Sequence, residues 1–256
     1  MQNKTVSVIT VVFNGAKEIE RTIQNILAQT HPFIELIIVD GGSTDGTQAI
    51  IEKYSGHISR FVSEKDEGIY DAMNKGVALA TGRWVNFMNC GDGYASEKTI
   101  ENIIAFAQPG DEFIYGDYIA DYGHNGQRFI KAGKPVAPHL MVLSHQSVFA
   151  TRDLLCKYPF DTHLKICSDL RFYEECWHHK HMFRYYPHAV SVRSHAGLSD
   201  RNRTQAFRES EQVLLSFYPR QYVTARMQRI RMMHLLKHGS KKILPSFLQR
   251  MYRKWM

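Results

Sequence analysis

Apolar and polar segments alternate regularly along the first part of the chain. Apolar runs rich in β-branched residues predict buried strands at 6–13, 35–39, 58–63 and 84–88. Apolar residues at helical spacing predict helices at 18–28, from Asp45 or Thr47 to about Tyr54, at 69–80, and at 97–107 with Ser96 as N-cap. Strands that alternate with helices across short loops predict βαβ units, hence an α/β fold with a mainly parallel central sheet and flanking helices.

The regular alternation ends after about Pro109. A strand is expected at 112–115, followed by a Gly- and Asp-rich loop to about Gly133, and helices at 152–158 and 169–177. No uninterrupted apolar run approaches the roughly 20 residues of a transmembrane helix, and the N-terminus does not resemble a signal peptide. The four cysteines lack CxxC or metal-type spacing, which favours reduced thiols in a cytosolic protein.

Charge is unevenly distributed. The 256 residues include 32 Lys and Arg and 25 Asp and Glu. From Gln212 to the end there are 10 basic residues and no acidic one, so the first 211 residues carry a net charge of −3. A protein that binds nucleic acid over a uniformly basic surface would show a different distribution.

Four polar residues follow four predicted strands: Asn14, Asp40, Asp66 and Asp92. Parallel strands present their carboxyl ends at one edge of a sheet, and ligands bind there. We therefore expect these side chains on one rim.

The segment DGGSTDGT at 40–47 is rich in turn-forming residues, and a loop that caps a helix would explain it. We favour a ligand site, in which Asp40 accepts hydrogen bonds from a base or ribose and glycines such as Gly42 let the ligand approach. The absence of GxGxxG after the first strand argues against a dinucleotide site.

The segment EKDEGIYDAMNKG at 64–76 places several acids ahead of a helix, where the helix dipole favours them. The dipole does not explain Asn74 and Lys75, which lie a turn further on and could reach phosphate. The segment NCGDGY at 89–94 is either a turn or a site where Asp92 shares Mg²⁺ or Mn²⁺ with a diphosphate. Gly91 and Gly93 would then let the diphosphate approach the backbone.

Taken in order, SVITVVFN, VDGGSTDGT, SEKDEGIYDAMNKG and FMNCGD resemble the family 2 glycosyltransferases of the GT-A fold. The resemblance continues through SHQSVF at 144–149 and CSDLRF at 167–172, and it covers about residues 5–198. It is strongest to bacterial members that build exopolysaccharide, such as colanic acid, or O-antigen. It implies a Rossmann-like GT-A catalytic domain over 1–211, with a nucleotide-sugar half at about 1–108 and an acceptor half at about 109–211, followed by a helical tail at 212–256.

The resemblance also implies a nucleotide-diphosphate sugar donor, Mn²⁺ or Mg²⁺ as cofactor, and roles for particular residues. By resemblance, the nucleotide contacts are Thr10, Phe13, Asn14 and Asp40, with Asp66 also lining the donor pocket. Asn89 and Asp92 occupy the metal motif, commonly Asp-x-Asp, but Gly91 stands where many members have a second Asp. Asp169 matches the general base of inverting members, although it could instead cap the following helix with Ser168.

Histidines supply further candidates. His145 and Gln146 are either structural or, by resemblance, line the donor or acceptor site. His195 matches a late histidine that some GT-A enzymes use on the metal. The cluster at 178–181 has the pattern of a solvated helix end.

The tail carries apolar residues at helical spacing from Tyr222 onward, interleaved with Arg and Lys. A basic amphipathic helix suits an anionic membrane surface, although packing on the catalytic domain or on a second copy of the chain is the alternative. The resemblance implies a polyprenyl-linked or oligosaccharide acceptor at the cytoplasmic leaflet. We therefore expect a cytoplasmic protein bound peripherally to the inner face of the membrane through 222–256.

The sequence favours an inverting glycosyltransferase that uses a UDP-sugar. A GDP-fucose-type donor and a metal-dependent nucleotidyltransferase stay as alternatives, though the loop at 14–17 is too short and too poor in Gly and Arg for the latter. Binding of nucleic acid is not expected, since no aromatic and basic platform is present.

Overall fold

The computed structural model describes residues 5–132, 143–194, 197 and 202–238. The chain divides into two compact units, Met1–Arg203 and Thr204–Met256. Each unit is described by itself.

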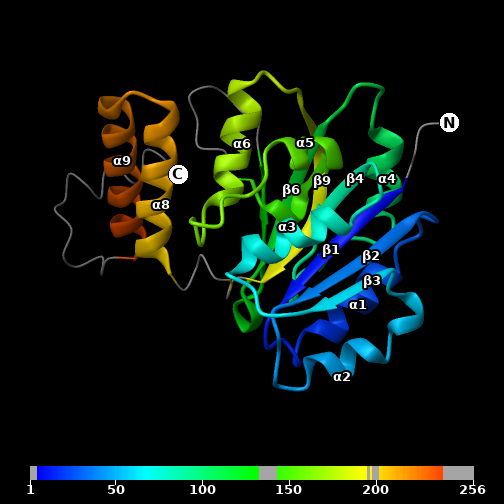
Figure 1. The fold of residues 1–256 in the computed structure, drawn as a ribbon. Coiled ribbons are helices and arrows are strands. Elements are labelled where there is room, and N and C mark those ends of the chain that lie inside the picture. Colours follow the sequence, from blue (N-terminus) through cyan, green and yellow to red (C-terminus); the bar gives the residue numbers. More distant parts are fainter. Residues whose placement is uncertain (1–4, 133–142, 195–196, 198–201, 239–256) are drawn as a thin grey trace. The chain divides into compact units, whose positions relative to one another are not determined.

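The first half of unit 1 alternates strands and helices as the sequence predicts (Figure 1). Its elements are β1 (Val6–Val12), α1 (Ile19–Leu27), β2 (Ile34–Asp40), α2 (Thr47–Glu52), the 3-10 turn η1 (Ser55–His57), β3 (Arg60–Ser63), α3 (Ile69–Leu79) and β4 (Trp84–Phe87). The four strands pair in parallel in the order β3-β2-β1-β4. Their carboxyl ends therefore share one edge, as the α/β prediction requires.

The second half of unit 1 makes the sheet mixed. Its elements are β5 (Gly93–Tyr94), α4 (Thr99–Phe106), β6 (Phe113–Asp121), η2 (Gly123–Asn125), β7 (Gln127–Ile130), η3 (His145–Ser147), β8 (Val148–Thr151), α5 (Arg152–Lys157), α6 (Ser168–His178) and β9 (Phe183–Ser194). The order continues from β4 through β8, β6 and β9 to β5. The pairs β4–β8, β8–β6 and β9–β5 are antiparallel and β6–β9 is parallel.

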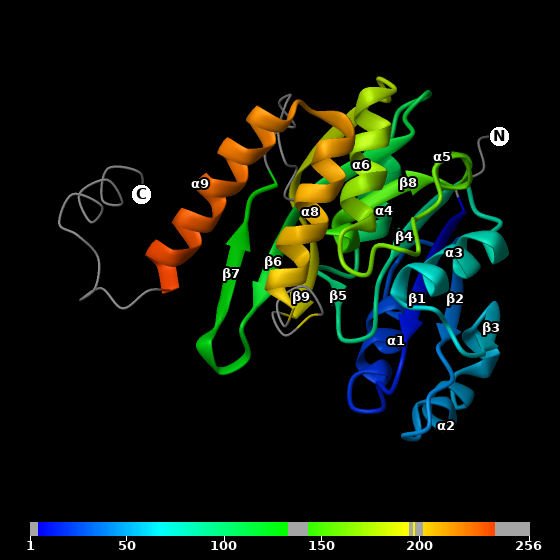
Figure 2. The same ribbon diagram turned by 60° about the vertical axis from the view of Figure 1, so that its left-hand side comes forward.

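A hairpin replaces the loop expected between 116 and 133. β6 continues to Asp121 because β9 pairs with it along its whole length, and β7 then returns antiparallel beside it (Figure 2). Gly126, with φ of 81°, closes the turn between the two strands. The Gly- and Asp-rich composition indicated this tight turn but not the strands around it.

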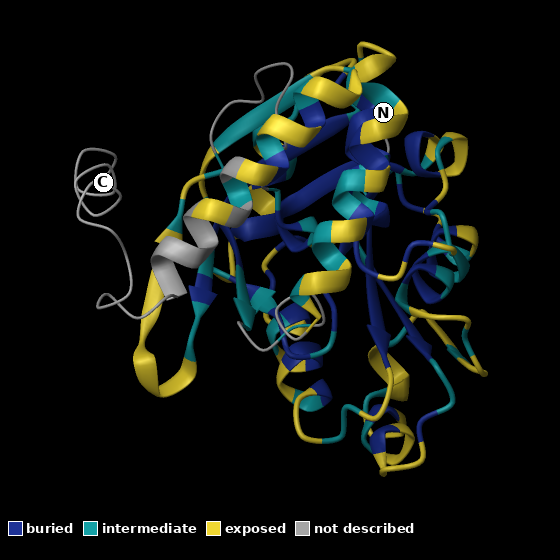
Figure 3. Cartoon of the chain, turned by 90° about the vertical axis from the view of Figure 1, so that its left-hand side faces the viewer, coloured by how far each residue is buried: buried dark blue, intermediate teal, exposed yellow. Residues whose placement is uncertain are grey.

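Two apolar layers cover the faces of the sheet. On one face, Ile9 and Val11 of β1 pack with side chains of α3, α5 and α6. On the other face, Val8 and Val12 pack with α1, α2 and α4. The parallel strands β1, β2 and β4 are accordingly almost entirely buried, while β3, β7 and the outer sides of the helices are largely exposed (Figure 3). This three-layer arrangement leaves the carboxyl edge of the parallel strands as the place where loops gather.

Two helix starts differ from the predicted caps. Gly46 holds the N-cap position of α2, and the Asp45 carboxylate instead accepts hydrogen bonds from the N–H groups of Thr47 and Ala16. Lys98 holds the N-cap position of α4, so the prediction of Ser96 was wrong by two residues. Ser96 accepts a hydrogen bond from Lys98 N–H in the preceding turn.

Unit 2 contains α8 (Arg203–Phe217) and α9 (Arg220–His238), which agrees with the predicted helical extension. Val213 and Leu214 of α8 and Val223 and Met227 of α9 are buried. The first part of the apolar stripe predicted to face a membrane is therefore covered, and residues 239–256 lie outside the described residues. Among the described helices, none has the length and apolar character needed to cross a membrane.

Glu35 joins strands β1 and β2 to the turn before β4, and its removal should destabilise unit 1. Its carboxylate accepts hydrogen bonds from the Ser7 hydroxyl and from the N–H and hydroxyl of Thr81. Burial by itself would raise the pKa of Glu35, but these hydrogen bonds outweigh it and the pKa is lowered from 4.5. We expect Glu35→Gln to lower the free energy of unfolding by about 1–3 kcal/mol at neutral pH, since an amide nitrogen would then face donors.

The pH dependence of this effect follows from the direction of the shift. A lowered pKa in the folded state gives stability that is present above the unfolded value and is lost as pH falls through the folded value. The difference between wild type and Glu35→Gln should therefore shrink well below pH 4.5. Urea unfolding at neutral and acidic pH measures it, with the exposed Glu52→Gln as control. A difference that is constant with pH, or equal to that of the control, would contradict this assignment.

Candidate active site

The loops after β1 and β2 are joined by hydrogen bonds at the carboxyl edge of the sheet. Asn14 has a positive φ of 50°, its Oδ1 accepts from Thr44 N–H at 2.9 Å, and its own N–H donates to Ser43 Oγ at 2.7 Å. Gly15 N–H donates to Thr47 Oγ1 at 2.9 Å. The two predicted nucleotide loops thus form one rigid wall, and the Asn14 side chain is part of what holds it together.

Asp40 is fully buried at the end of β2. Its carboxylate accepts hydrogen bonds from the N–H and hydroxyl of Ser43 and from Ser63 Oγ. Both oxygens are therefore used to hold the loop, including Gly42 with φ of 81°, against β3. Contact of Asp40 with a nucleotide stays a prediction.

The Phe13 ring and the Asp66 carboxylate lie beside the loops that follow β1 and β2. The Phe13 side chain is 67% exposed directly after β1. A methyl group added at Gly41 would lie 3.4 Å from the Phe13 ring and 3.1 Å from Asp66 Oδ2. Phe13 and Asp66 therefore flank a position that only glycine leaves open, and an exposed ring beside such an opening suits stacking on a planar group.

Of three residues predicted to contact the nucleotide sugar, Thr10 is buried, and Asn74 and Lys75 have other partners. Thr10 lies in the middle of β1 with 0% exposure, so its side chain does not reach the rim. The Asn74 side chain exchanges hydrogen bonds with the backbone of Phe160. Lys75 Nζ is surrounded by three carboxylates at 2.6–3.1 Å, those of Glu64, Asp66 and Asp71, which raise its pKa against the opposing effect of burial. Local partners therefore hold both side chains, and contact of Asn74 and Lys75 with phosphate stays a prediction.

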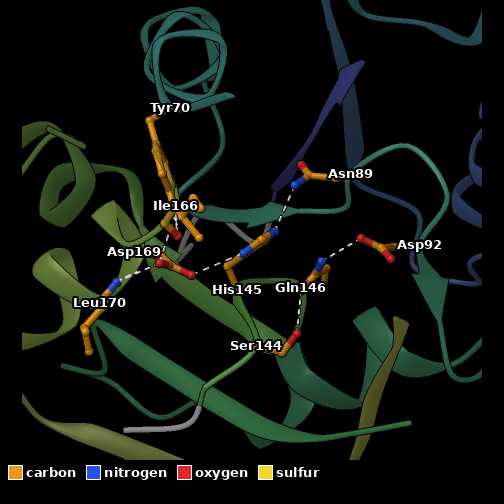
Figure 4. A network of polar contacts seen from close by, with 9 residues as sticks. All are labelled: Tyr70, Asn89, Asp92, Ser144, His145, Gln146, Ile166, Asp169 and Leu170. Atoms are coloured by element: carbon orange, nitrogen blue, oxygen red, sulfur yellow. Dashed lines mark hydrogen bonds and ion pairs between the residues drawn. The ribbon is translucent and has the colours of Figure 1, made fainter. Parts of the chain in front are cut away.

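The second part of the site centres on His145 in η3 (Figure 4). His145 Nε2 lies 2.9 Å from Asn89 Nδ2, and His145 Nδ1 lies 3.4 Å from Asp169 Oδ2. Asp169 Oδ1 accepts from Leu170 N–H at 2.8 Å and lies 3.1 Å from the Tyr70 hydroxyl. The imidazole of His145 therefore links Asn89, in the loop after β4, to Asp169 in the first turn of α6.

Asp169 does not act as a helix cap. Cys167 holds the N-cap position of α6, and Asp169 is the second helical residue, with its side chain 20% exposed. Tyr70 was not singled out from the sequence. Its hydroxyl donates to Ile166 O at 2.6 Å, and burial raises its pKa well above the usual value. The phenol therefore stays protonated beside the carboxylate.

The third part of the site is Asp92, held by the residue next to His145. Gln146 Nε2 donates to Asp92 Oδ2 at 2.6 Å, and Ser194 N–H donates to Asp92 Oδ1 at 3.0 Å. Burial raises the pKa of the Asp92 carboxyl, partly offset by these hydrogen bonds. The two hydrogen bonds therefore hold the Asp92 carboxylate in place, but they do not fully offset the effect of burial on its pKa.

Gly91 supports Asp92 in a way that differs from the prediction. It is buried with φ of 95°, and a methyl group there would lie 2.8 Å from Glu18 Oε2. Thr22 Oγ1 accepts from Gly91 N–H and donates to Asp92 O. The positive φ favours glycine at this position, and contact of Gly91 with a diphosphate stays a prediction.

A divalent metal ion at this site would need ligands from the side chains around Asn89 and Asp92. Among the described residues, no group of three His, Cys, Asp or Glu side chains could hold one. Asn89 Oδ1 is buried without a hydrogen-bond partner, and the raised pKa of Asp92 would be lowered by a nearby cation. These residues fit a cation that takes its remaining oxygens from a bound diphosphate. His195 lies outside the described residues.

The histidine cluster at the end of α6 has ordinary structural partners. His178 and His179 contact the carbonyls of Glu174 and Glu175, and His181 Nδ1 lies 2.6 Å from Glu112 Oε2. His181 is more buried than expected for a solvated face, with 12% exposure.

This geometry defines a class of protein. An α/β sheet that presents an exposed aromatic ring and two held carboxylates at the carboxyl ends of its parallel strands is typical of proteins that bind nucleotides at that edge. Comparison with known proteins identifies the family within this class of nucleotide-binding proteins. The model of glycosyl transferase family 2 matches residues 7–156.

The chain belongs to glycosyl transferase family 2 and has the GT-A fold. It is 30% identical over 206 residues to a PGL/p-HBAD biosynthesis glycosyltransferase of Mycobacterium bovis, covering 76% of this chain and 78% of that one. S. aureus TarS 1-349 in complex with UDP-GlcNAc superposes with a TM-score of 0.67 at 16% identity, over 96% of this chain and 77% of that one.

A third similar structure is the mannosyltransferase PcManGT from Pyrobaculum calidifontis, in complex with GDP-Man and Mn²⁺. It has a TM-score of 0.64 at 17% identity, covering 94% of this chain and 78% of that one. The family decides between two alternatives drawn from the sequence, because it makes the protein a glycosyltransferase and not a nucleotidyltransferase.

Proposed function

We propose that this protein is an inverting glycosyltransferase that moves a sugar from a nucleotide-diphosphate sugar to a lipid-linked oligosaccharide in bacterial surface polysaccharide synthesis. The observation that carries the proposal is the pair Asp92 and Asp169, which neighbouring residues of η3 hold at the carboxyl edge of the sheet (Figure 4). Inverting transfer needs one carboxylate near the leaving diphosphate and another near the attacking hydroxyl.

The donor base would stack on Phe13 and meet the carboxylate of Asp66. Phe13 is exposed beside Gly41. Lys75 donates to Oδ1 of Asp66, and Oδ2 of Asp66 lies beside Gly41. A carboxylate oxygen accepts the imide N–H of uracil, and we favour a UDP-sugar on that ground. UDP-GlcNAc bound to the similar TarS supports this choice, while GDP-Man bound to PcManGT keeps a GDP-sugar as the alternative donor.

Asp92, with Asn89 beside the same loop, would hold Mn²⁺ or Mg²⁺ together with the donor diphosphate. The buried, unpartnered Asn89 Oδ1 and the raised pKa of Asp92 support this assignment, as does Mn²⁺ in the similar PcManGT structure. A bound cation would supply stabilisation of the negative charge that gathers on the departing nucleoside diphosphate.

Asp169 would act as the general base. The acceptor hydroxyl attacks the anomeric carbon, its oxygen forms the new glycosidic bond, and its proton passes to Asp169. The bond from that carbon to the diphosphate oxygen breaks in the same step, and the electron pair leaves with the nucleoside diphosphate. Asp169 is 20% exposed, its Oδ1 accepts from Leu170 N–H and its Oδ2 lies 3.4 Å from His145 Nδ1. The carboxylate is thus held, while a second lone pair of Oδ2 can take the proton.

The acceptor would be lipid-linked, with the basic tail drawing the protein to the inner face of the cell membrane. Ten basic and no acidic residues from 212 onward support electrostatic attraction to anionic lipids. Assembly of the same chain into an oligomer is an alternative use of the tail. The glycosyltransferase relative named for PGL/p-HBAD biosynthesis supports a glycoconjugate product.

Replacing Asp169 tests whether this residue is the general base. Asp169→Asn should lower the turnover number roughly 10²–10⁴-fold, because an amide takes no proton, and should leave binding of the donor nucleotide unchanged. The control is Asp153→Asn, which alters the second residue of α5 just as Asp169 is the second residue of α6. Release of nucleoside diphosphate and calorimetric binding give the two readouts. Turnover of Asp169→Asn near that of the control would show that Asp169 is not the base.

Replacing Asp92 tests the cation site. Asp92→Ala should remove most of the increase in nucleotide affinity that Mn²⁺ provides, an effect of roughly 10- to 100-fold, while leaving the metal-free affinity nearly constant. Titration calorimetry with UDP and with GDP, in the presence and absence of Mn²⁺, measures this affinity. It also shows whether the uracil or the guanine nucleotide binds more tightly. Asp121→Ala, at an exposed hairpin end, is the control. Equal metal dependence in wild type and Asp92→Ala rejects the assignment.

Removing 222–256 tests the tail. The truncated protein should lose sedimentation with anionic vesicles, since each basic residue near such a surface contributes on the order of 1 kcal/mol. Neutral vesicles serve as the control, and turnover on a soluble acceptor analogue checks that unit 1 stays folded. Continued sedimentation of an active truncated protein would exclude the tail as the anchor.

A further inference from the structure

The η3 turn places His145 between two residues of the proposed active site, and in the described part of the chain its side chain has no other hydrogen-bond partner. Asn89 Nδ2 lies 2.9 Å from its Nε2, and Asp169 Oδ2 lies 3.4 Å from its Nδ1 (Figure 4). The ring also borders a small cavity lined by apolar side chains such as Phe87, Val148 and Phe160. The imidazole is 19% exposed and is fixed at both nitrogens.

The hydrogen-bond chemistry of Asn89 determines which nitrogen of His145 carries the proton. An amide nitrogen only donates, so Asn89 Nδ2 needs an unprotonated Nε2 as its acceptor. The proton of the neutral ring then lies on Nδ1, which faces the Asp169 carboxylate. Asn89 therefore selects the tautomer that can donate to Asp169.

The backbone of η3 is itself firmly held. The buried Asn86 side chain donates to the carbonyls of Gln146 and Val148, and Ser147 Oγ donates to Asp117 O. The imidazole is thus mounted on a turn that β4 and β6 hold in place. Groups that must orient a reacting side chain need this kind of support.

We propose that His145 is a positioning residue that orients the Asp169 carboxylate through an Nδ1–H donor, and that Asn89 sets this tautomer. The inference rests on the proposed function, in which Asp169 is the base. It replaces the expectation that His145 contacts the donor sugar. Together, Leu170 N–H on Oδ1 and His145 on Oδ2 restrict rotation of the carboxylate, so that it meets the acceptor hydroxyl in one orientation.

Kinetics of two variants separate positioning from donor binding. His145→Ala should lower kcat roughly 10- to 100-fold, as loss of a supporting hydrogen bond does at other sites, with the donor KM and the calorimetric nucleotide affinity changed by less than about two-fold. A contact with the donor sugar would instead raise the donor KM.

Asn89→Asp tests the role of the tautomer. A carboxylate only accepts, so it would draw a proton to Nε2, and Nδ1 would then donate to Asp169 only from a ring protonated at both nitrogens. We expect kcat to fall as in His145→Ala. If Asn89 served only the cation, the added carboxylate would keep or improve Mn²⁺-dependent binding and leave kcat at the wild-type level.

A spectroscopic measurement reads the tautomer without any need for turnover. Long-range ¹H–¹⁵N correlation on the full chain should show His145 with a proton on Nδ1 alone in the wild type and with a proton on Nε2 in Asn89→Asp, with the resonance identified by its absence in His145→Ala. His181→Ala is the matched control, because it removes another His–carboxylate pair of unit 1 away from η3, and it should leave kcat unchanged. Thermal unfolding checks that each variant folds.

The outcomes separate the inference from the proposed function. If the wild type transfers sugar while His145→Ala and Asn89→Asp keep its kcat, or if wild-type His145 is the Nε2–H form, the inference fails alone. If the wild type transfers no sugar from any nucleotide donor, the proposed function fails and the inference fails with it. Lower kcat with unchanged donor affinity, together with the Nδ1–H form, supports the inference.

Discussion

The site depends on a single 3-10 turn, η3, whose adjacent residues His145 and Gln146 each contact a carboxylate from elsewhere in the chain. Gln146 holds Asp92 at 2.6 Å and His145 faces Asp169 at 3.4 Å. Asn86 of β4 secures the backbone of this turn through two carbonyls. Because consecutive residues have a fixed separation along the backbone, the distance between the two carboxylates is set by local geometry rather than by flexible loops.

This constraint explains the mixed sheet. A purely parallel arrangement would bring only the loops after β1, β2, β3 and β4 to the site. The antiparallel insertion of β8 beside β4 carries η3, which directly precedes β8, to the same edge. The parallel pairing of β9 with β6 brings Ser194 to Asp92. One mixed sheet therefore gathers the loops after the parallel strands, the η3 turn and the end of β9.

Several polar residues near the rim maintain the shape of the site and leave few groups free for a ligand. Asp40 and Asn14 hold the loops, Lys75 neutralises three carboxylates, and Asn74 clamps the backbone of Phe160. Among the described residues near the rim, the exposed Phe13 ring, Oδ2 of Asp66 and Oδ1 of Asn89 have no hydrogen-bond partner, and the carboxylates of Asp92 and Asp169 are held by their neighbours. A small number of placed polar groups on a rigid frame is the usual composition of a nucleotide-sugar pocket.

The sequence by itself determined the strands and helices of the first half, the shared edge of the strand ends, and the family, because apolar periodicity and ordered motifs are local properties. It also identified Asp92, Asp169 and His145 as candidates. Only the tertiary structure decided what each side chain touches. Thr10 is buried in the core, Thr22 of α1 holds the loop at Gly91 and Asp92, and β6 is long because β9 pairs with it. Such contacts join residues distant in the chain, so no spacing within a motif encodes them.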